Sequence, residues 1–128
     1  MIINRSIDIE DEIRIALKGY LNVYCRPLPE AYSLPHILIT QVGGIDQDGQ
    51  IDTFDVTLDA RAKNSADANE YLRTAIGVLR KIAQDQSTAI RYVTVNSSGS
   101  WGSDPVRPDL AMYSARIRVV AHLETTTI

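Results

Sequence analysis

The sequence has few residues that could form covalent or metal-linked cross-links. Its 128 residues include one cysteine and two histidines. A single cysteine, Cys25, cannot form an internal disulfide, so we expect the chain to fold in a reducing compartment. His36 and His122 stand far apart in the sequence, and no serine or cysteine motif accompanies either of them. Neither histidine therefore indicates a general base.

Long apolar runs and an excess of positive charge are also missing. No apolar stretch approaches the roughly 18 residues of a membrane-spanning helix, and the start MIINRSIDIEDE lacks the apolar core of a signal peptide. We therefore expect a soluble protein with no membrane partner, made in the cytoplasm. The formal net charge of −3 argues against a protein that coats nucleic acid. Residues 1–128 fit a single globular domain of ordinary composition, with 45% hydrophobic residues.

The spacing of apolar residues predicts two helices and four strands. Helical spacing covers residues 6–23 and a second segment that begins after 64, with Ser65 as its expected N-cap. Period-two alternation or apolar runs predict strands at residues 36–42, 51–63, 90–96 and 111–123. The predicted fold class is α+β, a two-layer domain in the order α-β-β-α-β-β. Its mainly antiparallel four-stranded sheet carries both helices on one face.

The second strand has the clearest alternation. Phe54, Val56 and Leu58 should point toward the helices, while Thr53 and Thr57 belong to the opposite, solvated face. Pro27 and Pro29 forbid helix in the segment after the first helix, which we read as an extended connection. Gly43 and Gly44 are expected to end the first strand.

The turn GGIDQDGQIDTFD between the first two strands partly matches a calcium-binding loop. It places Asp46 and Asp48 at ligand positions, but Gly44 stands where the first acidic ligand is required. The flanking segments also look like strands and not helices, and a polar hairpin turn explains the same residues. Asp52, Asp55 and Asp59 also have no histidine or cysteine near them at the spacing of metal ligands. We expect no metal site.

No group of residues predicts catalysis. Serines 97, 98 and 100 lack the GxSxG pattern of a nucleophile elbow, and GSWG lacks the Gly-Lys-Ser/Thr ending of a phosphate loop. Arg26 could lower the pKa of Cys25, although a partly buried structural cysteine is the favoured interpretation. We therefore predict a protein that is not an enzyme and has no catalytic residue and no cofactor.

Arginines on the last two strands leave a nucleic-acid-binding role open. Arg116 and Arg118 share one face of the last strand, and with Arg91 they could contact phosphates. No exposed aromatic pair accompanies them, and salt bridges to Asp55 and Asp59 explain the same charges. A nucleic-acid-binding or regulatory α+β module therefore stays as the alternative function.

The only tryptophan, Trp101, lies in the Gly/Ser-rich stretch NSSGSWGSDP, which we expect to be a loose loop. Trp101 either folds back into the core or serves as an anchor for a partner, since tryptophan is enriched at interface hot spots. Pro105 and Pro108 stiffen the segment that follows and lower the entropic cost of docking it.

Three segments resemble the tail terminator, or tail-completion, proteins of long-tailed bacteriophages. They are PHILITQVGG, FDVTLDARAKNSADANEYLRTAIGVLRKIA and SWGSDPVRPDLAMYSARIRVVAH, which lie between residues 35 and 122 of the 128. The resemblance implies a subunit that assembles into a ring, typically a hexamer, that caps the tail tube and joins it to the head connector. Expected partners are the tail tube protein and head-completion proteins. DNA would pass through the lumen without specific binding. The expected location is the virion tail or neck, after assembly in the bacterial cytoplasm. Small head-completion proteins are a near neighbour of this family.

A ring needs a head-to-tail contact between two different patches of the subunit. We expect the Trp101–Asp109 loop to supply one patch and the hairpin of the first two strands to supply the other. The candidate interface residues are Trp101, Asp104, Arg107, Asp46, Asp48, Thr53, Thr57 and Arg61.

Overall fold

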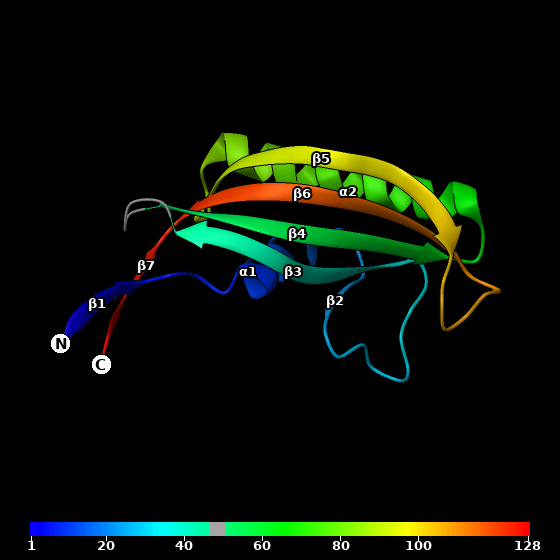
Figure 1. Cartoon of the computed structure of the whole chain (residues 1–128), viewed down its shortest axis with the longest axis horizontal. Coiled ribbons are helices and arrows are strands. Elements are labelled where there is room, and N and C mark those ends of the chain that lie inside the picture. Colours follow the sequence, from blue (N-terminus) through cyan, green and yellow to red (C-terminus); the bar gives the residue numbers. More distant parts are fainter. Residues whose placement is uncertain (47–50) are drawn as a thin grey trace.

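The computed structural model describes residues 1–46 and 51–128, without the side chains of residues 45, 46, 98–100 and 103. Figure 1 shows the arrangement of its helices and strands. The elements are β1 (Ile2–Arg5), α1 (Ile9–Leu17), β2 (Val23–Cys25), β3 (His36–Asp46), β4 (Ile51–Ala62), α2 (Ser65–Asp85), β5 (Ile90–Ser103), β6 (Ala111–His122) and β7 (Glu124–Thr127). The predicted α+β class is confirmed.

The main sheet has the strand order β2-β3-β4-β6-β5. Strands β3, β4, β6 and β5 pair antiparallel, whereas β2 pairs parallel to β3. The prediction of a four-stranded sheet is therefore wrong by one strand. β2 spans three half-buried residues directly before Arg26-Pro27. So short a strand cannot show a period of two. Its first residue, Val23, lies within the helix predicted over residues 6–23.

Both helices cover the same face of this sheet (Figure 1). α1 packs on β2 and β3, α2 packs across β3, β4, β6 and β5, and the two helices touch each other. The expected register of β4 is confirmed, because Phe54, Val56 and Leu58 are at most 5% exposed and join the helices in one core cluster. Neither helix in the described residues is long and apolar enough to cross a membrane.

The first helix is shorter than predicted. It runs only from Ile9 to Leu17, and the Asp8 side chain caps it by accepting the backbone N–H of Asp11 at 3.3 Å. Gly19 has poor helical propensity. Beyond it the chain must also turn to reach β2, so the helical spacing of Tyr20 and Leu21 continues without a helix. Tyr20 is 71% exposed.

Two strands are longer than predicted because bulges carry them through their glycines. β3 continues past Gly43 and Gly44 to Asp46, with its register shifted between Gln41 and Gly43. β5 continues through the Gly/Ser stretch to Ser103, with three register shifts against β6. A bulge places an extra residue in one strand and lets the ladder resume afterwards. The glycines therefore mark irregular pairing and not the strand ends that we expected.

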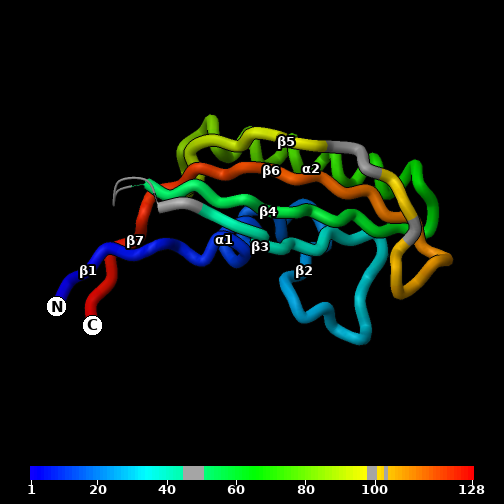
Figure 2. Tube along the Cα trace, viewed as in Figure 1, coloured from blue at the N-terminus to red at the C-terminus, as the bar shows by residue number. Residues whose placement is uncertain are grey.

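The two chain ends form a separate ribbon of β1 and β7, which the sequence did not predict. The backbones of Met1 and Ile128 bond to each other at 2.9 and 2.8 Å, and Arg5 Nε donates to Glu124 Oε1 at 2.7 Å. Figures 1 and 2 show both termini side by side, away from the main sheet. Four residues in each strand are too few for a recognisable sequence pattern.

The N-cap of α2 is Asn64 and not Ser65 as predicted. The Asn64 side chain accepts the backbone N–H of Asp67 at 2.9 Å, and its backbone is extended as an N-cap requires. Ser65 is the first helical residue instead. Asparagine and serine are about equally good N-caps, so the sequence favoured neither of these two adjacent residues.

We expect Asn64→Ala to lower the free energy of unfolding by about 1 kcal/mol, because the N–H of Asp67 loses its acceptor. Ser65→Ala is the matched control and should change stability by less than about 0.5 kcal/mol. Urea denaturation followed by circular dichroism measures both. A larger loss for Ser65→Ala than for Asn64→Ala would contradict this assignment of the cap.

Candidate interaction surfaces

Trp101 lies in the edge strand β5 and not in a loose loop. It pairs with Tyr113 of β6 and is 61% exposed. The alternative that Trp101 fills the core is therefore excluded. Direct cross-strand partners point to the same side of a sheet. Tyr113 packs against the core cluster, so Trp101 belongs to the helix-covered side and lies near the end of an open edge.

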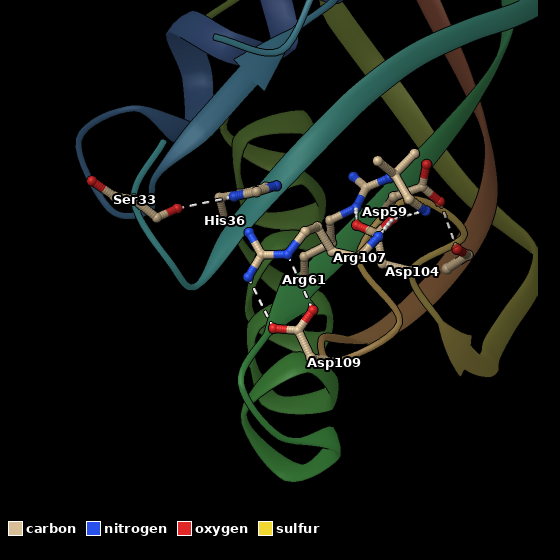
Figure 3. A network of polar contacts seen from close by, with 9 residues as sticks. Ser33, His36, Asp59, Arg61, Asp104, Arg107 and Asp109 are labelled. Carbon is tan, nitrogen blue, oxygen red and sulfur yellow. Dashed lines mark hydrogen bonds and ion pairs between the residues drawn. The ribbon is translucent and has the colours of Figure 1, made fainter. Parts of the chain in front are cut away.

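The loop between β5 and β6 is held by a buried ion pair (Figure 3). Arg61 Nε donates to Asp104 Oδ2 at 2.6 Å, and the two side chains are only 12% and 7% exposed. The other oxygen of Asp104 accepts the backbone N–H groups of Val106 and Arg107 at 2.9 and 3.3 Å. Burial alone would raise the pKa of Asp104, but these amides and the Arg61 guanidinium hold it below its ordinary value of 3.8. Asp104 thus fixes both the loop and its attachment to β4.

The rest of this loop presents exposed side chains on a fixed backbone. Leu110 is buried and its carbonyl accepts the N–H of Asp104 at 3.1 Å, which closes the loop. Val106 is 86% exposed at the tip. Arg107 bonds to Asp109 through two contacts of 3.1 and 2.9 Å, and this pairing raises the pKa of Arg107 and lowers that of Asp109. A partner would meet a pre-formed surface here.

His36 lies beside this ion pair and is fully buried. Its Nδ1 bonds to the Ser33 carbonyl at 2.9 Å, and the rings of Tyr24 and Tyr32 meet it edge-on at 5.3 and 4.9 Å. Burial lowers the pKa of His36 below its ordinary value of 6.5, and the charge of its cross-strand neighbour Arg61 adds to the effect. The ring is therefore kept neutral and packs between Tyr24 and Tyr32, outside the main core cluster.

The helix-free face of the sheet carries paired charges. Arg118 Nε donates to Asp55 Oδ1 at 3.0 Å, and Ser114 Oγ donates to Asp59 Oδ1 at 2.5 Å. Arg116 is exposed, and no ion pair in the described part of the chain involves it. The expected salt bridge to Asp55 is confirmed. Arg116 and Arg118 therefore do not form a row of unpaired arginines that could bind phosphates on this face.

The hairpin residues selected from the sequence are less accessible than expected. Thr53 is 4% exposed and Arg61 is tied to Asp104, so the prediction that both are exposed contact residues is wrong. Thr57 is half-buried. Asp46 is the last residue of β3, opposite Asp52, and Asp48 lies outside the described residues. Alternation alone could not show that Thr53 would be buried, or that Asp104 of the loop between β5 and β6 would pair with Arg61.

Cys25 is half-buried, and its thiol donates to the Glu10 carbonyl at 3.5 Å. Burial raises its pKa, and the nearby Glu10 carboxylate raises it further. Arg26 approaches Glu10 at 3.7 Å instead of the thiol. The structural interpretation of Cys25 is confirmed. Within residues 1–46 and 51–128, no three His, Cys, Asp or Glu residues lie close enough to hold a metal.

One surface was missed from the sequence because two distant elements build it. A groove runs between α2 and the edge strand β5. Its residues include Arg73, Ile76, Gly77, Arg80, Ala83, Arg91, Val93 and Val95. Ile76 and Ala83 are buried, and Val93 and Val95 pack against the core. The groove therefore combines an apolar floor with arginines on its rims. Only the pairing of β5 at the sheet edge, beside α2, brings these residues together.

We expect Asp104→Ala to lower the free energy of unfolding by about 3 kcal/mol or more, because Arg61 would be left buried without its counter-ion. Asp109→Ala is the matched control, since it removes an exposed acid from the same loop and should have little effect. Thermal denaturation compares the two variants with the wild type. Equal effects would show that the buried pair adds nothing beyond an ordinary surface contact.

The lowered pKa values of His36 and Asp104 predict how stability depends on pH. The unfolded chain takes up a proton at His36 near pH 6.5 while the folded chain resists it, so stability falls as the pH drops below about 6.5. Asp104 adds a second loss below pH 3.8. We expect His36→Phe to flatten the decrease in melting temperature between about pH 7 and about pH 5. An unchanged slope would show that His36 does not control this transition.

Comparisons with known proteins add no family assignment to this geometry. No protein-family model matches the chain, and no curated protein matches it.

Proposed function

We propose that the chain is a non-enzymatic structural subunit of a long-tailed bacteriophage or prophage. Copies of it form a ring, typically a hexamer, that caps the finished tail tube and joins it to the head connector. The ring belongs to the tail or neck of the virion and is assembled in the bacterial cytoplasm. The resemblance of the three sequence segments supports membership of the tail terminator family, and the exposed edge of the sheet supports assembly into a ring.

The observation that carries the proposal is the exposure of Trp101. A tryptophan that is 61% exposed in an edge strand gives its own fold little burial. The same ring buried at a subunit contact would contribute far more, and tryptophan is a frequent interface hot spot. Its strand is already ordered by β6, so docking costs little backbone entropy. These features support a role for Trp101 as an anchor for a partner.

The fold also suits a head-to-tail contact. β2 and β5 are the two edge strands of the main sheet. They differ in length, in the helix that covers them and in their charged residues. A contact between two different surfaces repeats around an axis and closes into a ring when the rotation allows it. A symmetric dimer would instead require one surface to match itself.

The helix-free face suits a lumen through which DNA passes without being held. Arg118 is neutralised by Asp55, and Asp59 is bonded to Ser114. Such a face lacks the dense positive charge that phosphate binding requires. The β1–β7 ribbon extends away from the sheet (Figure 1) and suits contact with the tail tube protein or the head connector. The alternative, a nucleic-acid-binding or regulatory module, finds its best support in the unpaired Arg116.

We expect Trp101→Ala to weaken ring formation, or the docking of the ring on tail tubes, by about 2 kcal/mol or more, while the subunit stays folded. Val42→Ala removes another exposed apolar side chain, 46% exposed on β3, and should assemble normally. Light scattering after gel filtration measures the assembly, and circular dichroism measures the fold.

Two results would count against the proposal. A wild-type protein that stays monomeric and does not bind tail tubes would overturn the structural role. Specific binding of DNA or RNA that is lost in Arg116→Glu would favour the alternative.

A further inference from the structure

The groove between α2 and β5 has three features that its own chain does not explain. They are rim arginines, of which Arg80 and Arg91 are in no ion pair among the described residues, a glycine in the middle of the helix and an open strand edge. We propose that this groove receives the outer face of α1 from a second copy of the same chain. The inference rests on the ring proposed above and specifies which two surfaces of the subunit meet in it.

The arginines of the groove lack acidic partners that would neutralise them. Among the described residues, no ion pair involves Arg80 or Arg91. The Arg91 guanidinium donates to the carbonyls of Thr88 and Ile90, which carry no net charge. Arg73 approaches Glu70 at 3.6 Å, but both side chains are more than 70% exposed, and such surface pairs contribute little. The groove is therefore a positive surface with an apolar floor.

Gly77 stands in the middle of α2, on the side turned away from the core. Glycine inside a helix is less favourable than alanine. A Cβ at this position would meet no atom within 4 Å, so nothing in the chain requires the glycine. Arg73, Gly77, Arg80 and Gln84 follow one another at helical spacing along this rim of the groove. A glycine at this position would allow a partner's helix to come close to α2.

The α1 helix of a second copy has the complementary surface. Asp8, Asp11, Glu12 and Ile15 recur at the spacing i, i+3, i+4, i+7 and so share one stripe of the helix. Ile9, Ile13 and Leu17 occupy the opposite, buried stripe. Ile15 is an exposed apolar side chain, 48% accessible, among these acids. Asp11 is paired with Arg14 at 2.7 Å, whereas Asp8 and Glu12 are in no ion pair among the described residues. An acidic stripe with one apolar residue matches an arginine-rimmed groove with an apolar floor.

The positions of these surfaces allow the contact to repeat in one direction. α1 packs on β2 and β3 at one edge of the sheet, whereas the groove borders β5 at the other edge. Each copy can therefore use its α1 stripe toward one neighbour and its groove toward the next. Trp101 lies further along the same β5 edge and would be buried by the same neighbour.

Reversing one charge on each surface tests the pairing. We expect Arg80→Glu and Glu12→Lys each to weaken assembly about tenfold or more while circular dichroism remains that of the folded wild type. An equimolar mixture of the two variants should assemble again. In the mixed ring the two variants would alternate. Each α1 stripe with Glu12→Lys would then meet a groove with Arg80→Glu, and each unchanged stripe would meet an unchanged groove. Light scattering after gel filtration reports each state.

Two further variants separate this pairing from a general effect of charge or stability. Arg116→Glu reverses an exposed charge on the helix-free face and should assemble normally. Gly77→Ala should raise the melting temperature of the subunit and yet weaken assembly, because the added methyl group obstructs the groove.

The pairing is overturned if Arg80→Glu and Glu12→Lys assemble like the wild type, or if their mixture stays apart. It is also overturned if Arg116→Glu is equally defective, or if Gly77→Ala assembles like the wild type. Loss of assembly in Trp101→Ala alone would preserve the ring and reject this groove. A wild-type chain that never assembles would reject the ring itself.

Discussion

The alternation of β4 is the constraint on which the rest of this structure depends. β4 lies between β3 and β6, and its apolar side chains from Phe54 to Ala62 point to one side. Both helices must therefore share that side, and the single core cluster combines their apolar stripes with those of the three central strands. The consequence is a sheet with one polar face and two unequal edges. The surfaces available for assembly are set by this one-sided burial.

The sequence predicted the elements whose patterns are long. The 21 residues of α2 show a complete apolar stripe, and β4 and β6 alternate over 12 residues each. The missed elements are short: β2 has three residues, and β1 and β7 have four each. Their existence depends on a neighbour elsewhere in the chain, namely β3 for β2 and the opposite terminus for β1 and β7. No local pattern could reveal such partners.

The Gly/Ser stretch before Trp101 shows why composition misled us about this segment. Glycine and serine are typical of loops, but the pairing partner β6 is long enough to hold them as a bulged edge strand. The sequence therefore suggested correctly that Trp101 lies outside the core, although for the wrong structural reason. Its order comes from pairing with β6, and its exposure comes from the edge position. Order and exposure together make it suitable as an anchor.

Burial also explains why some charged residues pair within the subunit while others stay available to a partner. Arg61 and Asp104 have opposite charges and lie far apart in the sequence, so they could have met between two subunits. They meet instead within one subunit, at 2.6 Å, where Asp104 also accepts two backbone amides of its loop. A partner could capture either residue only by leaving the other buried and unpaired, which costs several kcal/mol. Assembly must therefore use charges that the fold leaves unpaired, and among the described residues Arg80 on α2 and Arg91 on β5, which border the same groove, meet that condition.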